Sequence, residues 1–212
     1  MADRPLLVLG TGNRKKGREM ADLLVPAGVE LRTLADFPNA MQVAEDGDTF
    51  AANAAKKAAQ QARHLGHWVL ADDSGLAVDH LRGAPGVYSA RFSGPGATDT
   101  LNNEKLLAEL AGLPPEQRGA QFVCHLALAD PSGTLRAQSQ GACRGRILTV
   151  ARGAQGFGYD PLFEVREYHR TFAELGLVAK AALSHRARAL RNLLPALQAL
   201  VDTGQWLAAE PH

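Results

Sequence analysis

The chain has 212 residues, of which 46% are hydrophobic and 21% charged, and its formal net charge is +1. This length predicts one domain with a sizeable core, large enough to be built as two lobes. The near-neutral charge argues against a general binder of nucleic acid or other polyanions, and the apolar runs are too short to span a membrane.

Two further features bear on the cellular compartment. The N-terminal residues lead directly into a predicted strand, without the apolar stretch and cleavage site of a signal peptide. Cys124 and Cys143 lack the spacing of metal ligands. We therefore expect a cytoplasmic protein with reduced cysteines, although the sequence leaves a single disulfide open.

The first strand and the turn after it predict an anion site. Residues 6–10 form an apolar run, and a helix is expected over residues 14–24. A glycine-containing turn before a basic helix start directs backbone N–H groups and the helix dipole towards phosphate. The dinucleotide fingerprint fails because Lys15 stands where a third glycine is needed, and the P-loop fails because Arg18 and Glu19 replace its Lys-Ser/Thr pair. The alternative is an ordinary solvated basic helix start.

A second helix is predicted over residues 50–65, after a strand over residues 29–34. Either Asp48 or Thr49 is suited to cap this helix. Asn53 and Lys57 lie four residues apart and share a face, so Lys57 is either a substrate-facing cation or an ordinary solvated residue. Glu45 precedes the helix and is free to reach a metal ion.

The chain is organised around residues 69–94. The apolar run 68–70 predicts a buried strand that ends in Asp72 and Asp73, followed by a tight turn containing Ser74 and Gly75. Because adjacent strand residues point to opposite faces, one carboxylate is expected to reach a ligand crevice while the other braces the turn. A carboxylate there suits Mg²⁺ binding or proton transfer from water, and the alternative is a simple Asx-turn. Residues 76–78 and 87–92 are predicted to form further short strands.

The middle of the chain predicts a change from strand–helix alternation to a hairpin. A helix starting at Thr98 or Asp99 is expected to run to about residue 110. Alternating apolar residues over 122–128 predict a half-buried strand whose antiparallel partner spans 134–144, which favours a mixed sheet. His125 lies on the opposite face to the apolar set and is interpreted as a surface or packing residue rather than a ligand.

The C-terminal part contains two candidate binding segments. In the glycine-flanked loop 156–161, Phe157 or Tyr159 is suited to stack on a base and Asp160 to accept from a base or ribose; the alternative is a tight turn with buried aromatics. A capping box at Thr171 predicts a short helix. Ser184 is a good N-cap for the last helix, whose apolar stripe is Leu190, Leu193, Leu194, Leu197 and Leu200.

His185 and Arg186 then lie in the first turn of that last helix, beside the positive end of its dipole. Cations are unfavourable there unless an anion or an acceptor compensates them. This local conflict indicates a functional role.

Six motifs in order resemble the inosine triphosphate pyrophosphatase family, whose bacterial members are dITP/XTP pyrophosphatases. The resemblance spans residues 6–197, and the motifs are Thr11-Gly12-Asn13-x-x-Lys16, Phe50-x-x-Asn53-Ala54, Ala71-Asp72-Asp73-Ser74-Gly75-Leu76, Gly83-x-Pro85-Gly86-Val87-x-Ser89-Ala90-Arg91, Gly156-Phe157-Gly158-Tyr159-Asp160-Pro161 and Ser184-His185-Arg186.

This resemblance implies an α/β fold, an elongated mixed β-sheet flanked by helices, with two lobes and the nucleotide site in the cleft between them. It implies a homodimer that uses Mg²⁺ to hydrolyse ITP, dITP and XTP to the monophosphate and pyrophosphate, which cleanses the nucleotide pool. Residues 1–212 would form this one two-lobed domain.

The resemblance also implies roles for individual residues. Asp73 would be the general base and a metal ligand, and Glu45 a second metal ligand. Phosphate contacts would come from Thr11, Gly12, Asn13, Arg14, Lys15 and Lys16. Further substrate contacts would come from Asn53, Lys57, Ser74, Phe157, Gly158, Tyr159, Asp160, Lys180, His185 and Arg186.

Two other functions stay open at this point. One is a related pyrophosphatase of the Maf type that acts on other nucleotides, which the loop 156–160 and the Ser184-His185-Arg186 motif argue against. The other is a nucleotide-binding regulatory module without turnover, which the intact carboxylates Asp73 and Glu45 argue against.

Overall fold

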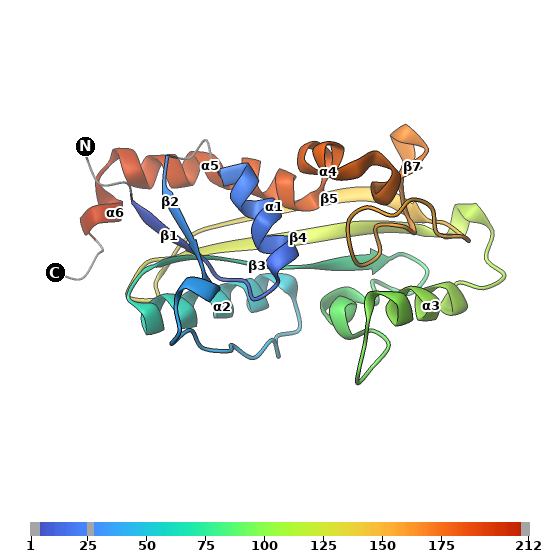
Figure 1. Cartoon of the computed structure of the whole chain (residues 1–212), viewed down its shortest axis with the longest axis horizontal. Helices are drawn as coiled ribbons and strands as arrows, with labels where there is room; N and C mark the ends of the chain where they lie inside the picture. The colour runs from blue at the N-terminus through green and yellow to red at the C-terminus, as the bar shows by residue number, and fades with distance from the viewer. Residues whose placement is uncertain (1–4, 25–27, 209–212) are drawn as a thin grey trace. The chain divides into compact units, whose positions relative to one another are not determined.

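A seven-stranded mixed sheet is the centre of the computed structural model, which describes residues 5–24 and 28–208 (Figure 1). Its strand order is β2-β1-β3-β4-β5-β6-β7. The strands are β1 (Leu6–Leu9), β2 (Glu30–Thr33), β3 (Trp68–Val78), β4 (Gly119–Ala129), β5 (Leu135–Ile147), β6 (Phe163–Val165) and β7 (Arg170–Thr171). The first residues of the chain, which bear on the expectation of no signal peptide, lie outside the described residues.

Both strand directions occur in this sheet, which confirms the predicted mixed α/β fold. β1 runs parallel to β2 and to β3, whereas β6 is antiparallel to β5 and to β7. The neighbours β4 and β5 are joined by residues 130–134, a connection too short for a parallel crossover, so they form the predicted hairpin.

The chain divides into two compact units. Unit 1 comprises residues up to Asp73, Cys124–Gly141 and the chain from Arg186 on; unit 2 comprises Ser74–Val123 and Ala142–His185. The strands β3, β4 and β5 each contribute residues to both units.

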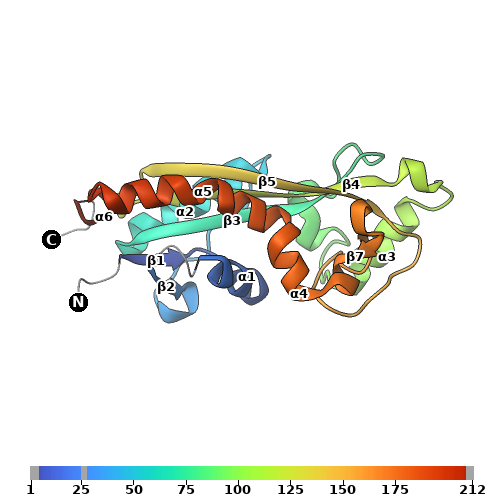
Figure 2. The same ribbon diagram turned by 90° about the horizontal axis from the view of Figure 1, so that it is seen from above.

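In unit 1, helices cover both faces of the sheet (Figures 1 and 2). These helices are α1 (Arg14–Leu24), α2 (Phe50–Leu65), α5 (His185–Asp202) and α6 (Gln205–Ala208). On one face, α1, α5 and Trp206 pack against large apolar residues of β1, β3 and β4. On the other, α2 packs through Ala54, Ala58 and Ala62, so this second layer consists of small residues.

The predicted ends of the unit 1 helices are largely confirmed. Helix α2 begins after Thr49, whose side chain accepts from the backbone N–H of Ala52, and ends at Gly66 in the left-handed conformation. The apolar stripe of α5 lies in the core as predicted. Cys124 and Cys143 are both buried free thiols, so the open question of a disulfide is settled.

Unit 2 has its own aromatic core. The helices of this unit are α3 (Asp99–Glu109), which Thr98 caps, and α4 (Phe172–Leu183), which starts with the predicted capping box at Thr171. The rings of Phe122, Phe163 and Phe172 contact one another at centroid distances between 4.6 and 6.1 Å.

The predicted turn at Asp72–Gly75 is wrong, because β3 continues through these residues to Val78. Gly75 marks a close approach rather than a turn: a Cβ there would lie 2.6 Å from the carbonyl oxygen of Gly86 and 2.3 Å from Oγ of Ser89. The two carboxylates are therefore mid-strand residues on opposite faces.

The predicted strand over residues 87–92 is also wrong, because this segment is the 3-10 helix η3 (Gly86–Arg91). Its backbone is held by Asn102 of α3, whose amide donates to the carbonyls of Ser89 and Ala90 and accepts from the N–H of Ser93. These side-chain bonds satisfy backbone groups that a strand would pair with a neighbouring strand.

Within the described residues, no helix is both long and apolar enough to cross a membrane.

Candidate active site

The β1–α1 loop is shaped by Asn13. Its side-chain oxygen accepts from the backbone N–H groups of Lys15 (3.0 Å) and Lys16 (3.2 Å), and its own N–H donates to the hydroxyl of Thr11. The expectation that the N–H groups of this helix start point outward to an anion needs correction at these two residues. The positive charge at the loop is therefore supplied by exposed side chains, those of Arg14 and Lys15.

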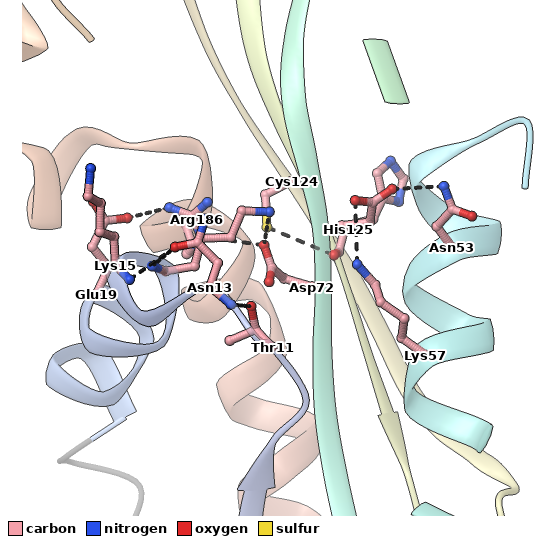
Figure 3. Close-up of polar contacts among 12 residues, drawn as sticks. Thr11, Asn13, Lys15, Glu19, Asn53, Lys57, Asp72, Cys124, His125 and Arg186 are labelled. Atoms are coloured by element: carbon pink, nitrogen blue, oxygen red, sulfur yellow. Dashed lines mark hydrogen bonds and ion pairs between the residues drawn. The ribbon is translucent and has the colours of Figure 1, made fainter. Parts of the chain in front are cut away.

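One face of β3 carries a buried chain of alternating charges (Figure 3). The Nζ atom of Lys16 lies 3.2 Å from Oδ2 of Asp72, and Nε of Arg186 lies 3.6 Å from the same oxygen. Nη1 of Arg186 in turn donates to Oε2 of Glu19. Burial alone would lower the pKa of Arg186, but Asp72 and Glu19 raise it, so the guanidinium stays charged.

The opposite face of β3 presents Asp73 to α2, and Figure 3 shows Asn53 and Lys57 of α2 on the side of the strand opposite Arg186. Nδ2 of Asn53 donates to Oδ2 of Asp73 at 3.1 Å, and Nζ of Lys57 lies 3.5 Å from Oδ1. Asn53 also bonds the backbone of Gly47 in both directions, which fixes the segment before α2. The prediction that Asp72 and Asp73 serve different faces is confirmed.

Burial sets the protonation behaviour of this second face. It raises the pKa of Asp73 above its ordinary value, and the opposing effects of Lys57, Lys16 and Asn53 do not cancel this. Burial would lower the pKa of Lys57, but Asp73 and its neighbouring carboxylates raise it. The site therefore pairs a proton-accepting carboxylate with a cation that stays charged.

Two carboxylates of this face converge on a single cation position. The ammonium of Lys57 lies 3.0 Å from Oε1 of Glu45 and 3.5 Å from Oδ1 of Asp73. Among the described residues no group of three or more His, Cys, Asp and Glu is arranged for a metal. Mg²⁺ at a phosphate site needs only one or two carboxylates together with water and phosphate oxygens, so this donor set fits the ion.

His125 of β4 lies on the α2 side of β3 (Figure 3), where it is a packing residue, as predicted. Its ring stacks on Phe50 of α2 at a centroid distance of 6.4 Å. Burial lowers its pKa, while the negative charge of Asp73 opposes that change. The ring is thus a neutral packing group within the electrostatic reach of Asp73.

Unit 2 holds the second group of predicted residues. Nζ of Lys180 donates to Oδ2 of Asp160 at 2.6 Å, and both side chains are buried. The same oxygen accepts from the backbone N–H of Phe157, and the Lys180 ammonium lies 4.1 Å from the centre of the Phe157 ring. Asp160 therefore braces the loop and orients Lys180.

The rest of this loop is held by α3 and by the core. Asp99 accepts from the N–H of Gly158, and Asn103 donates to the carbonyl of the same residue. Tyr159 is buried, and its hydroxyl donates to the carbonyl of Ser89 at 2.8 Å. Of the two aromatics predicted to stack on a base, only Phe157 lies outside the core.

His185 and Ser184 are both buried at the junction of α4 and α5. The His185 ring stacks on Phe122 of β4 at 4.8 Å, with 12° between the ring planes. Ser74 lies in β3, directly after Asp73. By unit, the predicted site residues divide into two groups: residues 11–16, Glu45, Asn53, Lys57, Asp73 and Arg186 belong to unit 1, and Ser74, residues 157–160, Lys180 and His185 belong to unit 2.

Sequence reasoning missed three residues that hold these clusters. Glu19 was considered only as a mismatch to the P-loop, yet it binds Arg186. Asp99 and Asn103 hold Gly158, and their spacing of four residues on one helix face was a readable signal. For Glu19 the signal was its position three residues after Lys16, on the same face of α1.

Comparison with known proteins gives one consistent result. A model of the Ham1 family matches residues 7–196. A protein of Rhodopirellula baltica named dITP/XTP pyrophosphatase is 58% identical over 197 residues, which cover 93% of this chain and 95% of that protein. A second protein of the same name, from Desulforamulus reducens, is 50% identical and covers 92% of this chain and 96% of its own.

Solved structures agree with these relatives. The structure of a HAM1 protein from Coxiella burnetii has a TM-score of 0.84 at 37% identity and covers 92% of this chain and 99% of that one. The crystal structure of a nucleoside-triphosphatase / dITP/XTP pyrophosphatase from Mycobacterium abscessus has a TM-score of 0.73 at 44% identity, covering 91% and 99%.

Proposed function

The chain belongs to the Ham1 family, and from this we infer that it is a nucleoside-triphosphate pyrophosphatase. Its substrates are the non-canonical purine nucleotides ITP, dITP and XTP, which it cleaves to the monophosphate and pyrophosphate and so removes from the nucleotide pool. The observation that carries this is the buried Asp73 with a raised pKa, placed beside Lys57 and Glu45.

The reaction is a hydrolysis of a phosphoanhydride bond. A water molecule gives its proton to Asp73 as its oxygen forms a new bond to phosphorus, and the bond to the leaving phosphate oxygen breaks. Asn53 fixes the orientation of the Asp73 carboxylate by its 3.1 Å hydrogen bond. Lys16 and Lys57 neutralise charge on the phosphates, which is the main demand of phosphoryl transfer.

Asp73 and Glu45 would hold Mg²⁺ when it is bound, and the ion would add charge neutralisation at the phosphates. Lys57 shares the same two carboxylates, so its ammonium would add positive charge beside the ion at the phosphates.

The residues of unit 2 are proposed to bind the nucleoside. Phe157 offers a ring face to the base, and Lys180, oriented by Asp160, offers N–H groups. Hypoxanthine and xanthine carry a 6-oxo acceptor where adenine carries an amino donor. A site lined by donors such as Lys180 and His185 therefore favours hypoxanthine and xanthine over adenine, because its donors can pair with the 6-oxo group but not with the 6-amino group.

The test is direct. Purified protein incubated with ITP and Mg²⁺ should release IMP and pyrophosphate, with ATP as the control substrate. Turnover of other nucleotides in preference to ITP would favour a Maf-type pyrophosphatase, and binding of ITP without turnover would favour a regulatory module.

Three finer properties complete the proposal. Activity requires Mg²⁺, is lost in excess EDTA and is supported poorly by Ca²⁺, because the larger ion does not enforce octahedral geometry. The protein acts as a homodimer, which light scattering of the purified chain would test. It works in the cytoplasm, where its substrates arise.

A further inference from the structure

Phe157, whose ring is proposed to face the base, lies between two glycines. Gly156 and Gly158 both have positive φ angles, +83° and +61°. Because glycine has wide conformational freedom, these neighbours do not by themselves fix the direction of the Phe157 ring. The ring is only partly buried, so core packing does not fix it either. Its direction therefore depends on the hydrogen bonds of the loop backbone.

Two sets of hydrogen bonds hold this backbone. Within the loop, Oδ2 of Asp160 accepts from the N–H of Phe157 at 2.8 Å, and the N–H of Asp160 donates to the carbonyl of Phe157 at 3.2 Å. From outside the loop, α3 holds Gly158 at both of its polar groups. The N–H of Gly158 donates to Oδ2 of Asp99 at 2.9 Å, and its carbonyl accepts from Nδ2 of Asn103 at 3.0 Å. Asp99 and Asn103 are four residues apart, so both reach the loop from one face of α3.

A further link joins the same loop to α3 through η3. The hydroxyl of the buried Tyr159 donates to the carbonyl of Ser89 at 2.8 Å, and Nδ2 of Asn102 donates to the same carbonyl at 3.3 Å. Burial and the negative charge of Asp99 raise the pKa of Tyr159, so its hydroxyl stays protonated and remains a donor. Three residues of α3 thus support the two residues that follow the aromatic ring.

We propose that Asp99 and Asn103 are positioning residues for the base, which act by holding Gly158 so that the Phe157 ring faces the nucleotide. The inference rests on the proposed function, in which unit 2 binds the nucleoside. Neither side chain needs to touch the nucleotide. Removing either bond frees the backbone of Gly158 and lowers the fraction of the loop in its binding form, and the affinity for the base falls by the same fraction. The phosphate contacts, which come from residues of unit 1, are unaffected.

Positioning, stability and charge make different predictions for these two residues. A loss of stability alone would lower the amount of folded protein, and the folded molecules would bind every ligand as before. Charge alone would act on every anionic ligand, because Asp99 is an exposed anion and its removal would strengthen the binding of pyrophosphate as well. Positioning weakens only the ligands that carry a base and leaves pyrophosphate binding unchanged.

The experiment compares the wild type with Asp99→Ala, Asp99→Asn, Asn103→Ala and Glu104→Ala. It measures the Kd of IMP and of pyrophosphate by calorimetry in the presence of Mg²⁺, together with KM and kcat for ITP. The Asp99→Ala and Asn103→Ala variants each remove one bond to Gly158. Asp99→Asn loses the charge but keeps an oxygen that can accept from Gly158. Glu104→Ala is the matched control, because Glu104 is an exposed residue of the same helix.

For Asp99→Ala and Asn103→Ala we expect the Kd of IMP and the KM for ITP to rise together by roughly 3- to 10-fold, the effect of losing one hydrogen bond. The Kd of pyrophosphate and the kcat for ITP should stay within about twofold of the wild type. Asp99→Asn should lie between the wild type and Asp99→Ala, and Glu104→Ala should match the wild type.

Three results would overturn the inference. They are unchanged IMP binding by the folded Asp99→Ala or Asn103→Ala protein, a loss of affinity that is equal for IMP and pyrophosphate, and an equal loss of IMP binding in Glu104→Ala. If one alanine variant does not fold, the other removes a bond to the same glycine and decides the matter. Absence of ITP turnover in the wild type would refute the proposed function alone, because the binding measurements do not depend on turnover. Failure of the wild type to bind IMP would overturn both.

Discussion

Asp73 is the residue whose charge the proposed reaction depends on most. Asp73→Asn keeps the shape of the side chain and its contact with Asn53, but it loses the proton acceptor and a metal ligand. Loss of a positioned general base typically costs ~10²–10⁴ in rate. We expect kcat for ITP to fall by that range while the circular dichroism spectrum is unchanged.

A control for this substitution is Asp79→Asn. Asp79 forms an exposed ion pair with Arg144 in unit 2, so the same chemical change there should leave turnover unaffected. Near-normal turnover by a folded Asp73→Asn protein would show that another group accepts the proton.

Asp130 predicts a pH dependence of stability rather than of activity. Burial opposes its ionisation, but hydrogen bonds from Ser132, Arg136 and Thr134 outweigh burial and lower the pKa of Asp130 below its ordinary value. A carboxyl with a lowered folded-state pKa stabilises the fold above its unfolded-state pKa, and the contribution is lost as pH falls through the folded-state pKa.

The corresponding measurement is urea unfolding of the wild type and Asp130→Asn between pH 7 and pH 3. The amide can still accept at Oδ1 but loses the charge-assisted bond from Arg136, so we expect a deficit of about 1–3 kcal/mol at pH 7. This deficit should shrink below about pH 4. A deficit that is constant with pH would mean that shape, not charge, matters at this turn.

At the residue scale, the sequence pointed to candidate residues that the structure brings close together, but it did not specify how they pair. Motif residues such as Asn53, Asp73 and Lys180 lie in the two charged clusters. The ion pair between Glu19 and Arg186 joins residues 167 positions apart, and no local pattern specifies it. Likewise, Asp160 looked suited to bind a base or ribose, and only the structure shows that it is occupied by Lys180 and the backbone of Phe157.

At the scale of elements, the helix starts were predicted correctly because they depend on local sequence. The predictions of a turn at residues 72–75 and of a strand at residues 87–92 were wrong because contacts with residues distant in sequence determine those segments. Thr49 and Thr98 cap their helices by accepting from the backbone N–H three residues later, so the local sequence is enough to predict where these helices start. Asp72 and Gly75 look like a turn, but their partners on α5 and η3 keep β3 extended. The segment 87–92, predicted as a strand, is a 3-10 helix for a similar reason, because Asn102 accepts and donates the hydrogen bonds that hold its backbone.

Two glycine substitutions test this account of β3. Gly75→Ala places a Cβ within 2.6 Å of a backbone carbonyl of η3, so the strand or η3 must shift, at a cost of about 1–3 kcal/mol. Gly17→Ala in α1 meets only Thr11 Cγ2 at 3.6 Å and gains helix propensity, so it should stabilise by about 0.5–1 kcal/mol. Thermal unfolding should show a lower midpoint temperature for Gly75→Ala and a higher one for Gly17→Ala. An unchanged midpoint for Gly75→Ala would mean that η3 moves aside at no cost in stability.

At the scale of the whole molecule, the strands predict how the two units unfold. β3, β4 and β5 each pass from one unit to the other without a break, so melting either unit frays strands that belong to both. The only two tryptophans, Trp68 and Trp206, lie in unit 1 and stack at 4.3 Å, so tryptophan fluorescence reports on that unit alone.

A destabilising substitution in unit 2 should therefore lower the unfolding midpoint that the tryptophans of unit 1 report. Phe163 lies in the aromatic core of unit 2, and Phe163→Leu should cost about 1 kcal/mol by loosening its contacts with Phe122 and Phe172. If the continuous strands make unfolding two-state, the urea midpoint measured by tryptophan fluorescence falls by the same amount as the midpoint measured by circular dichroism. A fluorescence midpoint that stays at the wild-type value while the circular dichroism midpoint falls would show that unit 2 melts first and that strand continuity does not couple the two.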